Sequence, residues 1–140
     1  DEATQNAMAP GNWMHTGDIA TRDEDNYFTI VDRKKDMILT AGYNIYPAEL
    51  ERVICGHRAV ALAAVGRIPD EARGELAKAY VVLKPGAQAS GQEIVDFCRE
   101  TLAAYKLPRA VQFVDSVPQT SSGKIMRRLL SEIDDGNRAL

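Results

Sequence analysis

A short loop that is rich in hydroxyl groups and ends in a lysine is the first place in this sequence where chemistry could occur. Residues 119–124 read QTSSGK and stand just before a predicted helix. Gly123 lets the backbone approach an anion closely, and Lys124 supplies a compact positive charge on a flexible stem. The leading glycine of a P-loop is missing, and no strand runs directly into the segment. On composition alone, Lys124 is more typical of a surface lysine than of an anion site.

Two polar segments upstream contain residue types, at a spacing, that could also bind a ligand. In residues 16–18 (TGD), Asp18 follows a glycine, and such a carboxylate can accept two hydrogen bonds from the vicinal hydroxyls of a ribose. Three residues alone favour a loop aspartate that caps a turn. Residues 32–36 (DRKKD) carry five consecutive charges between apolar strands, which is typical of a domain boundary and equally of an ordinary charged turn.

The elements that must position these residues follow an order typical of a small α/β protein. Residues 1–18 lack periodicity and are predicted as loop, followed by a hairpin of two short strands. From Met37 onward the pattern predicts ββαββαβα, which favours a small mixed sheet with a short hairpin and about three covering helices, an α/β (α+β) fold. Gly42 is expected at the tip of that second hairpin. Expected strands are 19–21, 27–31, 37–40, 44–46, 60–65, 77–84 and 110–114; expected helices begin at Pro47, at Ser90 with its apolar stripe running to Tyr105, and at Met126.

Composition limits the classes of function. The chain has 140 residues and a formal net charge of -3, so it lacks the broad cationic field that would make nucleic acid an expected partner. Cys55 and Cys98 form no metal-binding pattern with His15 or His57, so no metal site is predicted, and both thiols are expected to be reduced and buried in a cytosolic protein. No apolar run is long enough to span a membrane. The start at Asp1, without an initiator methionine, indicates a fragment of a longer protein.

Three motifs resemble those of one enzyme family. Residues 13–18 (WMHTGD) resemble the late nucleotide-binding motif of the adenylate-forming enzymes, which include acyl-CoA synthetases, luciferases and peptide-synthetase adenylation domains. Residues 32–38 (DRKKDMI), followed by 41–51 (AGYNIYPAELE), resemble the hinge motif of the family. Residues 118–125 (PQTSSGKI) resemble its C-terminal lysine motif. One such motif is weak, whereas three in the family's order and spacing indicate membership.

Details within the motifs favour the fatty acyl-CoA ligases of this family. Residues 105–108 (YKLP) and 123–128 (GKIMRR) are similar to the versions those ligases carry. Peptide-synthetase domains usually have methionine in place of Lys106 and an Asp-Arg pair soon after the catalytic lysine. This sequence departs from the family pattern at Asn26, where glycine is usual, and at Arg58, where proline is usual.

The resemblance implies a division of the chain and a set of ligands. Residues 1–34 are expected to be the tail of the large N-terminal adenylation domain, and 35–140 the mobile C-terminal lid domain. The phosphate-binding loop, the acyl and adenine pockets and the acidic Mg²⁺ ligand of the family all belong to the large domain, upstream of this segment. ATP and coenzyme A are the implied co-substrates, and a carboxylic acid, expected to be a fatty acid, is the implied substrate. The isolated fragment is expected to be inert, and the full-length ligase is expected in the cytoplasm, with peripheral membrane association left open.

For the first half-reaction, in which a carboxylate attacks ATP, the resemblance assigns four residues. Asp18 would bind the ribose hydroxyls, and Arg33 the ribose or phosphate side of the nucleotide. Lys124 would bridge the incoming carboxylate and the α-phosphate. Lys35 would be the hinge about which the lid rotates before the second step.

For the second half-reaction, in which the thiol of coenzyme A attacks the acyl-adenylate, the assigned residues lie elsewhere on the lid. Gly42 would lie against the pantetheine arm, with Tyr43 beside it. Lys106 and Arg109 are the residues expected to meet the phosphates of the coenzyme A nucleotide.

Other interpretations stay open. An adenylation domain that loads a carrier protein would keep the family and change the acceptor, although the residues after Lys124 argue against it. A stand-alone, non-catalytic module that binds a nucleotide or coenzyme A would change the class. Apolar residues in 1–34, such as Trp13 and Tyr27, are expected to be covered by the large domain or, in the isolated fragment, by a second copy in a homodimer.

Overall fold

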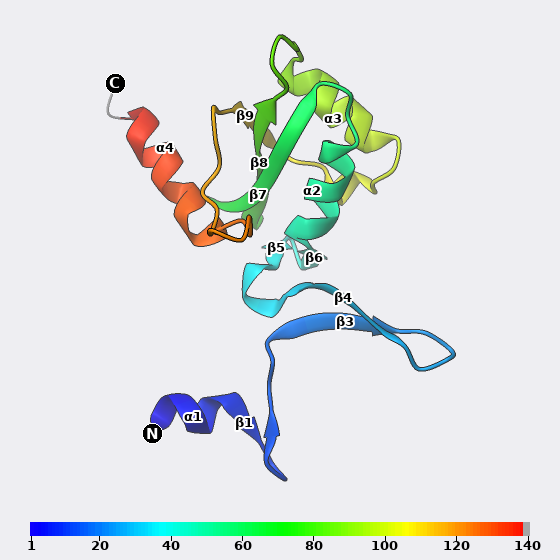
Figure 1. The fold of residues 1–140 in the computed structure, drawn as a ribbon, viewed down its shortest axis with the longest axis vertical. Coiled ribbons are helices and arrows are strands. Elements are labelled where there is room, and N and C mark those ends of the chain that lie inside the picture. The colour runs from blue at the N-terminus through cyan, green and yellow to red at the C-terminus, as the bar shows by residue number, and fades with distance from the viewer. Residues whose placement is uncertain (139–140) are drawn as a thin grey trace. The chain divides into compact units, whose positions relative to one another are not determined.

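The computed structural model describes residues 1–138, with side chains for residues 1–134. The chain forms two compact units, Asp1–Lys35 and Asp36–Leu140. Each unit has its own secondary structure, drawn from blue to cyan and from cyan to red in Figure 1. Among the residues that the structure describes, no helix is both long and apolar enough to cross a membrane.

The first unit is made of short elements with little core. Helix α1 (Glu2–Ala7) is followed by the paired strands β1 (Met8–Ala9) and β2 (Trp13–Met14), and then by the antiparallel hairpin of β3 (Asp18–Arg22) and β4 (Phe28–Arg33). The prediction of loop for residues 1–18 is wrong at α1. That helix has fewer than two turns and no buried residue, so it leaves no apolar periodicity in the sequence. It is fixed instead by Asp1, whose carboxylate accepts the N–H groups of Ala3 and Thr4.

The second unit is a mixed five-stranded sheet with helices on both faces. Strand β8 is central: β7 and β5 pair with it antiparallel, β9 pairs with it parallel, and β6 completes the edge beyond β5. The predicted α/β (α+β) fold is therefore confirmed. The 3-10 turn η1 (Lys34–Asp36) contains the division between the units. The elements that follow it are β5 (Ile38–Thr40), β6 (Tyr43–Ile45), α2 (Pro47–Cys55), β7 (Val60–Asp70), β8 (Gly74–Leu83), α3 (Gly91–Arg99), η2 (Ala104–Lys106), β9 (Ala110–Phe113), η3 (Arg127–Leu129) and α4 (Leu130–Arg138).

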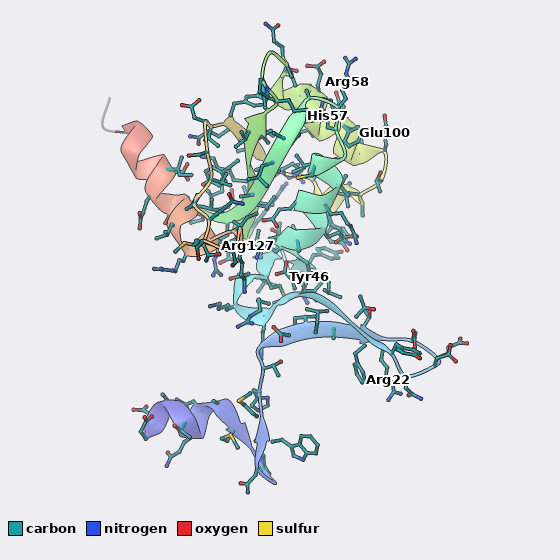
Figure 2. All side chains as sticks on the ribbon, viewed as in Figure 1. Arg22, Tyr46, His57, Arg58, Glu100 and Arg127 are labelled. Carbon is teal, nitrogen blue, oxygen red and sulfur yellow. The ribbon has the colours of Figure 1, made fainter. Side chains whose placement is uncertain are left out.

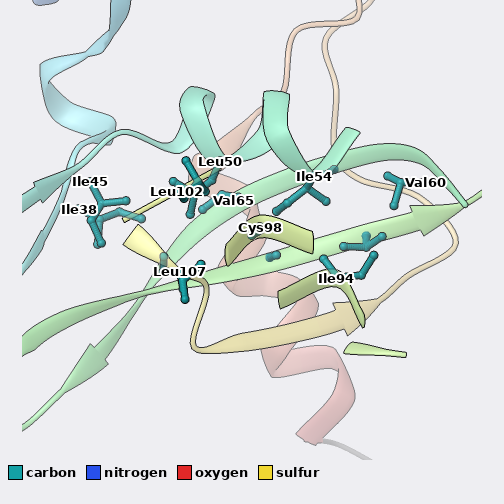
Figure 3. Packing of buried hydrophobic residues seen from close by; sticks show 14 residues of the cluster. Ile38, Ile45, Leu50, Ile54, Val60, Val65, Ile94, Cys98, Leu102 and Leu107 are labelled. Carbon is teal, nitrogen blue, oxygen red and sulfur yellow. The ribbon is translucent and has the colours of Figure 1, made fainter. Parts of the chain in front are cut away.

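The two faces of the sheet carry separate cores because side chains alternate along β7 and β8. On one face, Val65, Ala79 and Val81 belong to the buried cluster that includes Leu50 of α2 and Ile94 of α3. Figure 3 shows Val65, Leu50 and Ile94 of this cluster from close by. On the other face, Ala64 and Tyr80 pack with Val117 and Leu130, the first residue of α4. A strand covered on both faces explains the continuous apolar run at 60–65.

Three sequence predictions need correction. Strands β7 and β8 extend past the predicted ends to meet at Asp70↔Gly74, because their ladder continues beyond the helices into a more exposed arm. The stripe from Ile94 to Tyr105 is not one helix: α3 ends at Arg99, and Leu102 reaches the core from the following turn. Cys98 is buried as predicted, whereas Cys55 is exposed, because it is the last residue of α2 and lies off the face that packs on the sheet.

Candidate functional site

In the first unit, the structure brings two sequence-predicted residues together. Asp18 opens β3 and Arg33 closes β4, so they face each other across the ladder. The Arg33 guanidinium lies 3.1 Å from Asp18 Oδ1, with both side chains partly exposed. Gly17 (φ +76°) makes the turn that precedes Asp18, and its carbonyl accepts the N–H of Lys34 at 2.8 Å. The pair offers a carboxylate acceptor and a guanidinium donor side by side, which suits a ribose or a phosphate.

The predicted hinge residue stands where the two units divide. Lys35 is exposed and lies in the single 3-10 turn η1 (Lys34–Asp36), and the compact units separate between Lys35 and Asp36. A single 3-10 turn holds few backbone hydrogen bonds.

Gly42 occupies an open hairpin tip at the edge of the sheet. Strands β5 and β6 pair Thr40 with Tyr43, which leaves Ala41 and Gly42 as a two-residue loop with φ of +48° and +85°. Positive φ at both positions defines a type I′ turn. A Cβ built on Gly42 would meet no atom of this chain within 4 Å. The surface above this glycine is therefore free to receive another molecule.

An aromatic pair and an ion pair flank this tip. The rings of Tyr43 and Tyr105 stack with centroids 4.7 Å apart, although the residues are distant in sequence. The Lys106 ammonium lies 2.8 Å from both carboxylate oxygens of Glu49 on α2, so its charge is already partnered within the chain. Arg109 is exposed, and its backbone N–H donates to Ala77 O at 2.8 Å. Tyr43 therefore lies close to Lys106, because it stacks on Tyr105, the residue that precedes Lys106 in the chain.

Lys124 is exposed on a tight hairpin. Gln119 and Ile125 form an isolated antiparallel bridge, and Thr120 N–H donates to Lys124 O at 2.9 Å. Gly123 takes the left-handed conformation (φ +81°), as a three-residue hairpin loop requires. The Thr120 hydroxyl caps the turn by accepting the N–H of Lys124 at 3.1 Å. The hydroxyl-rich composition therefore builds the turn and leaves the Lys124 side chain exposed to solvent.

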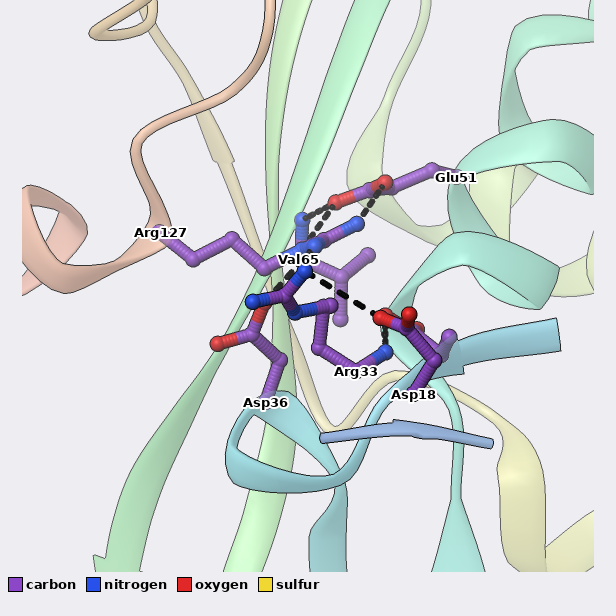
Figure 4. A network of polar contacts seen from close by, with 7 residues as sticks. Asp18, Arg33, Asp36, Glu51, Val65 and Arg127 are labelled. Atoms are coloured by element: carbon purple, nitrogen blue, oxygen red, sulfur yellow. Dashed lines mark hydrogen bonds and ion pairs between the residues drawn. The ribbon is translucent and has the colours of Figure 1, made fainter. Parts of the chain in front are cut away.

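The residues beneath this hairpin form a polar network that the sequence did not reveal. Arg127 donates through Nε and Nη2 to the two oxygens of Glu51, at 3.0 and 2.6 Å, and lies 3.1 Å from Asp36 Oδ2 through Nη1. Glu51 Oε1 also accepts the N–H of Val65 at 2.9 Å. Figure 4 shows the three side chains converging from η3, α2 and η1; Figure 2 labels Arg127 among the side chains of the whole chain.

The sequence singled out Arg127 only as part of the motif at residues 123–128 (GKIMRR), and Glu51 only as part of the segment 41–51 (AGYNIYPAELE). One signal was available: the buried residues of α2 are Pro47, Leu50, Glu51 and Ile54, so a carboxylate stands at core spacing. A buried charge requires a partner of opposite sign. The partner could not be named because Arg127 follows Glu51 by 76 positions.

The arrangement supplies cationic and hydrogen-bonding groups that suit anions. Within the side chains that the structure describes, no three His, Cys, Asp or Glu residues gather closely enough to hold a metal ion. No residue of this chain is therefore assigned to Mg²⁺.

Comparison with known proteins places this geometry in a family. A family model described as the AMP-binding enzyme C-terminal domain matches residues 49–124, more than half of the chain. The long-chain-fatty-acid–CoA ligase of Bacillus subtilis is 46% identical over 131 residues, which are 94% of this chain and 23% of that protein. The fatty acid–[acyl-carrier-protein] ligase ScoC of Streptomyces coeruleorubidus is 51% identical over 120 residues, 86% of this chain and 23% of that one.

A solved structure agrees with the sequence relatives. ATP-bound MatB from Rhodopseudomonas palustris matches with a TM-score of 0.87 and 32% identity, over 94% of this chain and 26% of that one. The chain belongs to the family of AMP-binding enzyme C-terminal domains, as the three motifs predicted. It spans about a quarter of the length of the relatives it matches.

Proposed function

We propose that this chain is the C-terminal lid of an ATP-dependent acyl-CoA ligase, together with the tail of the large domain that precedes it. The observation that carries this proposal is that one compact unit presents two exposed hairpin tips, one bearing Lys124 and the other Gly42. Each tip suits one half-reaction, so a rotation that exchanges them would separate the two steps.

In the first step, a carboxylate oxygen of the acid attacks the α-phosphorus of ATP, and pyrophosphate leaves. The Lys124 ammonium lies between the two anions, offsets their repulsion and stabilises charge that develops in the transition state. Asp18 accepts hydrogen bonds from the ribose hydroxyls, and Arg33, at 3.1 Å from Asp18, holds that carboxylate in place and contacts the nucleotide. Mg²⁺ would be bound by residues outside this chain.

In the second step, the thiol of coenzyme A attacks the acyl carbonyl, and AMP leaves. The pantetheine arm passes over Gly42, where the lack of a side chain keeps the surface open. Tyr43, stacked on Tyr105, borders that path. Lys106 and Arg109 meet the nucleotide phosphates, and the bond from Lys106 to Glu49 means that a phosphate must compete with an internal carboxylate.

The exchange between the two steps is a rotation at Lys35. The residue stands at the division between the compact units, so its backbone torsions can change without breaking either β-ladder. This assignment makes Lys35 a hinge, with no direct role in bond making.

A carrier protein is the second acceptor to consider. The relative from Streptomyces coeruleorubidus, which is 51% identical, is named as a ligase for an acyl carrier protein. Overall identity therefore does not separate the two acceptors. In both cases a phosphopantetheine thiol would pass Gly42.

The large-domain tail explains the exposed aromatic surface of the first unit. Trp13, Tyr27 and Phe28 are 75%, 73% and 69% exposed. We propose that the rest of the large domain covers these side chains in the complete ligase, in the cytoplasm, and that a second copy covers them in the isolated chain. Sedimentation of the 140-residue chain should show a dimer, and a monomer would contradict that part of the proposal.

The test is made on the complete protein that contains this chain. With ATP, Mg²⁺ and a panel of carboxylic acids, pyrophosphate should be released with at least one fatty acid. Coenzyme A and a holo-carrier protein are then compared as acceptors of the acyl group. The 140-residue chain alone should release no pyrophosphate. Turnover by the purified short chain, or no adenylation of any acid by the complete protein, would overturn the proposal.

A further inference from the structure

The polar network beneath the Lys124 hairpin fixes the position of that hairpin from two directions. Arg127 follows Lys124 by three residues, and its side chain is only 16% exposed. Its two bonds to Glu51 form a fork-to-fork pair, which sets the direction of the guanidinium as well as its distance. Glu51 is itself held by the N–H of Val65 in the sheet. The hairpin is thereby tied to α2 and to β7.

The same guanidinium also connects the hairpin to the segment around which the lid is expected to turn. Nη1 of Arg127 lies 3.1 Å from Asp36 Oδ2, and Asp36 is the residue after Lys35. Among the residues that the structure describes, the hydrogen bonds of Lys124 are made by its backbone groups, to Thr120 N–H and the Thr120 hydroxyl. These bonds close the turn and do not fix its orientation on the rest of the unit. Arg127 is the side chain that bonds the base of this hairpin to both α2 and η1.

We infer that Arg127 is a positioning residue for adenylation. It holds the Lys124 hairpin at a fixed position relative to Asp36, the first residue of the lid after the hinge. This inference rests on the proposed function. Arg127 touches no substrate; it acts through the hairpin. When the torsions of Lys35 change, Asp36, α2 and the hairpin move as one body, so that Lys124 arrives at the α-phosphate at a fixed place.

The Gly42 hairpin has anchors of its own. The Thr40 hydroxyl donates to Glu75 O at 2.6 Å, and Leu39 N–H donates to Glu75 Oε2 at 2.9 Å. Strand β5 is thus fastened to β8 without the help of Arg127. Loss of the guanidinium should therefore disturb the first half-reaction and spare the second.

The experiment compares Arg127→Lys with Arg128→Lys in the complete ligase, using the acid that gives the fastest pyrophosphate release. Lysine keeps the charge and loses the fork, and Arg128 is the exposed neighbour. A misplacement of about 1 Å can slow a reaction about 10²-fold, so Arg127→Lys should lower kcat for adenylation by about that factor, with KM little changed. Thioester formation from synthetic acyl-adenylate should stay within about twofold, and Arg128→Lys should be normal in both steps.

A structural role alone would give a different pattern, because loss of folded protein lowers both half-reactions equally. If Arg127→Lys folds poorly, Asp36→Asn is the second variant. It removes the charge of one partner of Arg127 and keeps the shape of the side chain. It should slow adenylation about tenfold and leave thioester formation unchanged. The inference is overturned if the folded variants slow both steps alike or slow neither. Lys124→Ala is measured in parallel. Full adenylation activity in Lys124→Ala would refute the proposed function itself, whereas a slow Lys124→Ala beside a normal Arg127→Lys refutes only the positioning role.

Discussion

Replacing Glu51 with leucine should destabilise the second unit more than any single surface change. The Glu51 side chain is 11% exposed and accepts three hydrogen bonds, two from Arg127 and one from Val65 N–H. Strand β7 lies at the edge of the sheet, so the N–H of Val65 has no neighbouring strand on that side and depends on Glu51. The substitution removes all three acceptor contacts at once.

The size of the loss follows from these contacts. Removing one partner of a buried ion pair costs about 3–5 kcal/mol, and an unsatisfied buried N–H costs about 1–3 kcal/mol. Arg127 keeps Asp36 as a partner, so a loss of about 4 kcal/mol is expected rather than the full sum. Glu51→Gln keeps an acceptor oxygen for Val65 and should lose about 1–3 kcal/mol.

Urea unfolding of the 140-residue chain, followed by circular dichroism, measures these differences. Glu71→Leu, at an exposed position in the β7–β8 turn, is the matched control and should change the free energy of unfolding by less than about 0.5 kcal/mol. The double variant Glu51→Leu with Arg127→Met should recover part of the loss, because apolar replacement of both partners removes the unpaired charge. A loss below about 1 kcal/mol in Glu51→Leu, relative to its control, would refute this account of the network.

Two further results are expected. Burial raises the pKa of both thiols, that of Cys98 to about 11, so the difference between them at pH 8 rests on access. A thiol reagent should modify the exposed Cys55 in the folded chain and the buried Cys98 only after unfolding, and equal rates would contradict the packing of α3. The pKa of Glu93 is lowered below 4.5 by the Ser90 backbone N–H first and by the Ser90 hydroxyl second, so its support for α3 is present above 4.5 and is lost as the pH falls through the lowered value. Ser90→Ala removes the hydroxyl and keeps the backbone N–H, so carbon-detected titration should show only a partial rise of the Glu93 pKa toward 4.5. An unchanged value would exclude the Ser90 hydroxyl as a cause of the shift.

Local features of the fold could be predicted from sequence because their partners are close along the chain. A helix was predicted to begin at Ser90, and the structure confirms α3 with Ser90 as its N-cap, held by both hydrogen bonds of a capping box with Glu93. The strand predicted at residues 77–84 is confirmed as part of β8 (Gly74–Leu83). Helix α1 was missed, since six residues of which none is buried carry no periodic signal.

The polar contacts around the candidate site could not be predicted, because they join residues that are far apart in sequence. Lys106 pairs with Glu49 across 57 positions, and Arg127 pairs with Glu51 across 76. Motif resemblance identified Lys106 as a residue of interest but gave no sign that a carboxylate already neutralises it. Glu51, at core spacing in α2, was the one signal of a buried charge in need of a partner.

The central claim is that Lys124 serves adenylation and Gly42 serves transfer to the thiol. The most direct test measures pyrophosphate release, and separately thioester formation from supplied acyl-adenylate, in Lys124→Ala and Gly42→Leu of the complete ligase. Lys84→Ala and Gly86→Leu are the matched controls, because Lys84 is exposed and Gly86 shares the positive φ (+74°) and open surroundings of Gly42. Lys124→Ala should slow adenylation about 10²–10³-fold and leave thioester formation near normal, and Gly42→Leu should do the reverse. Equal slowing of both steps by both variants, or an unchanged Lys124→Ala, would contradict the account.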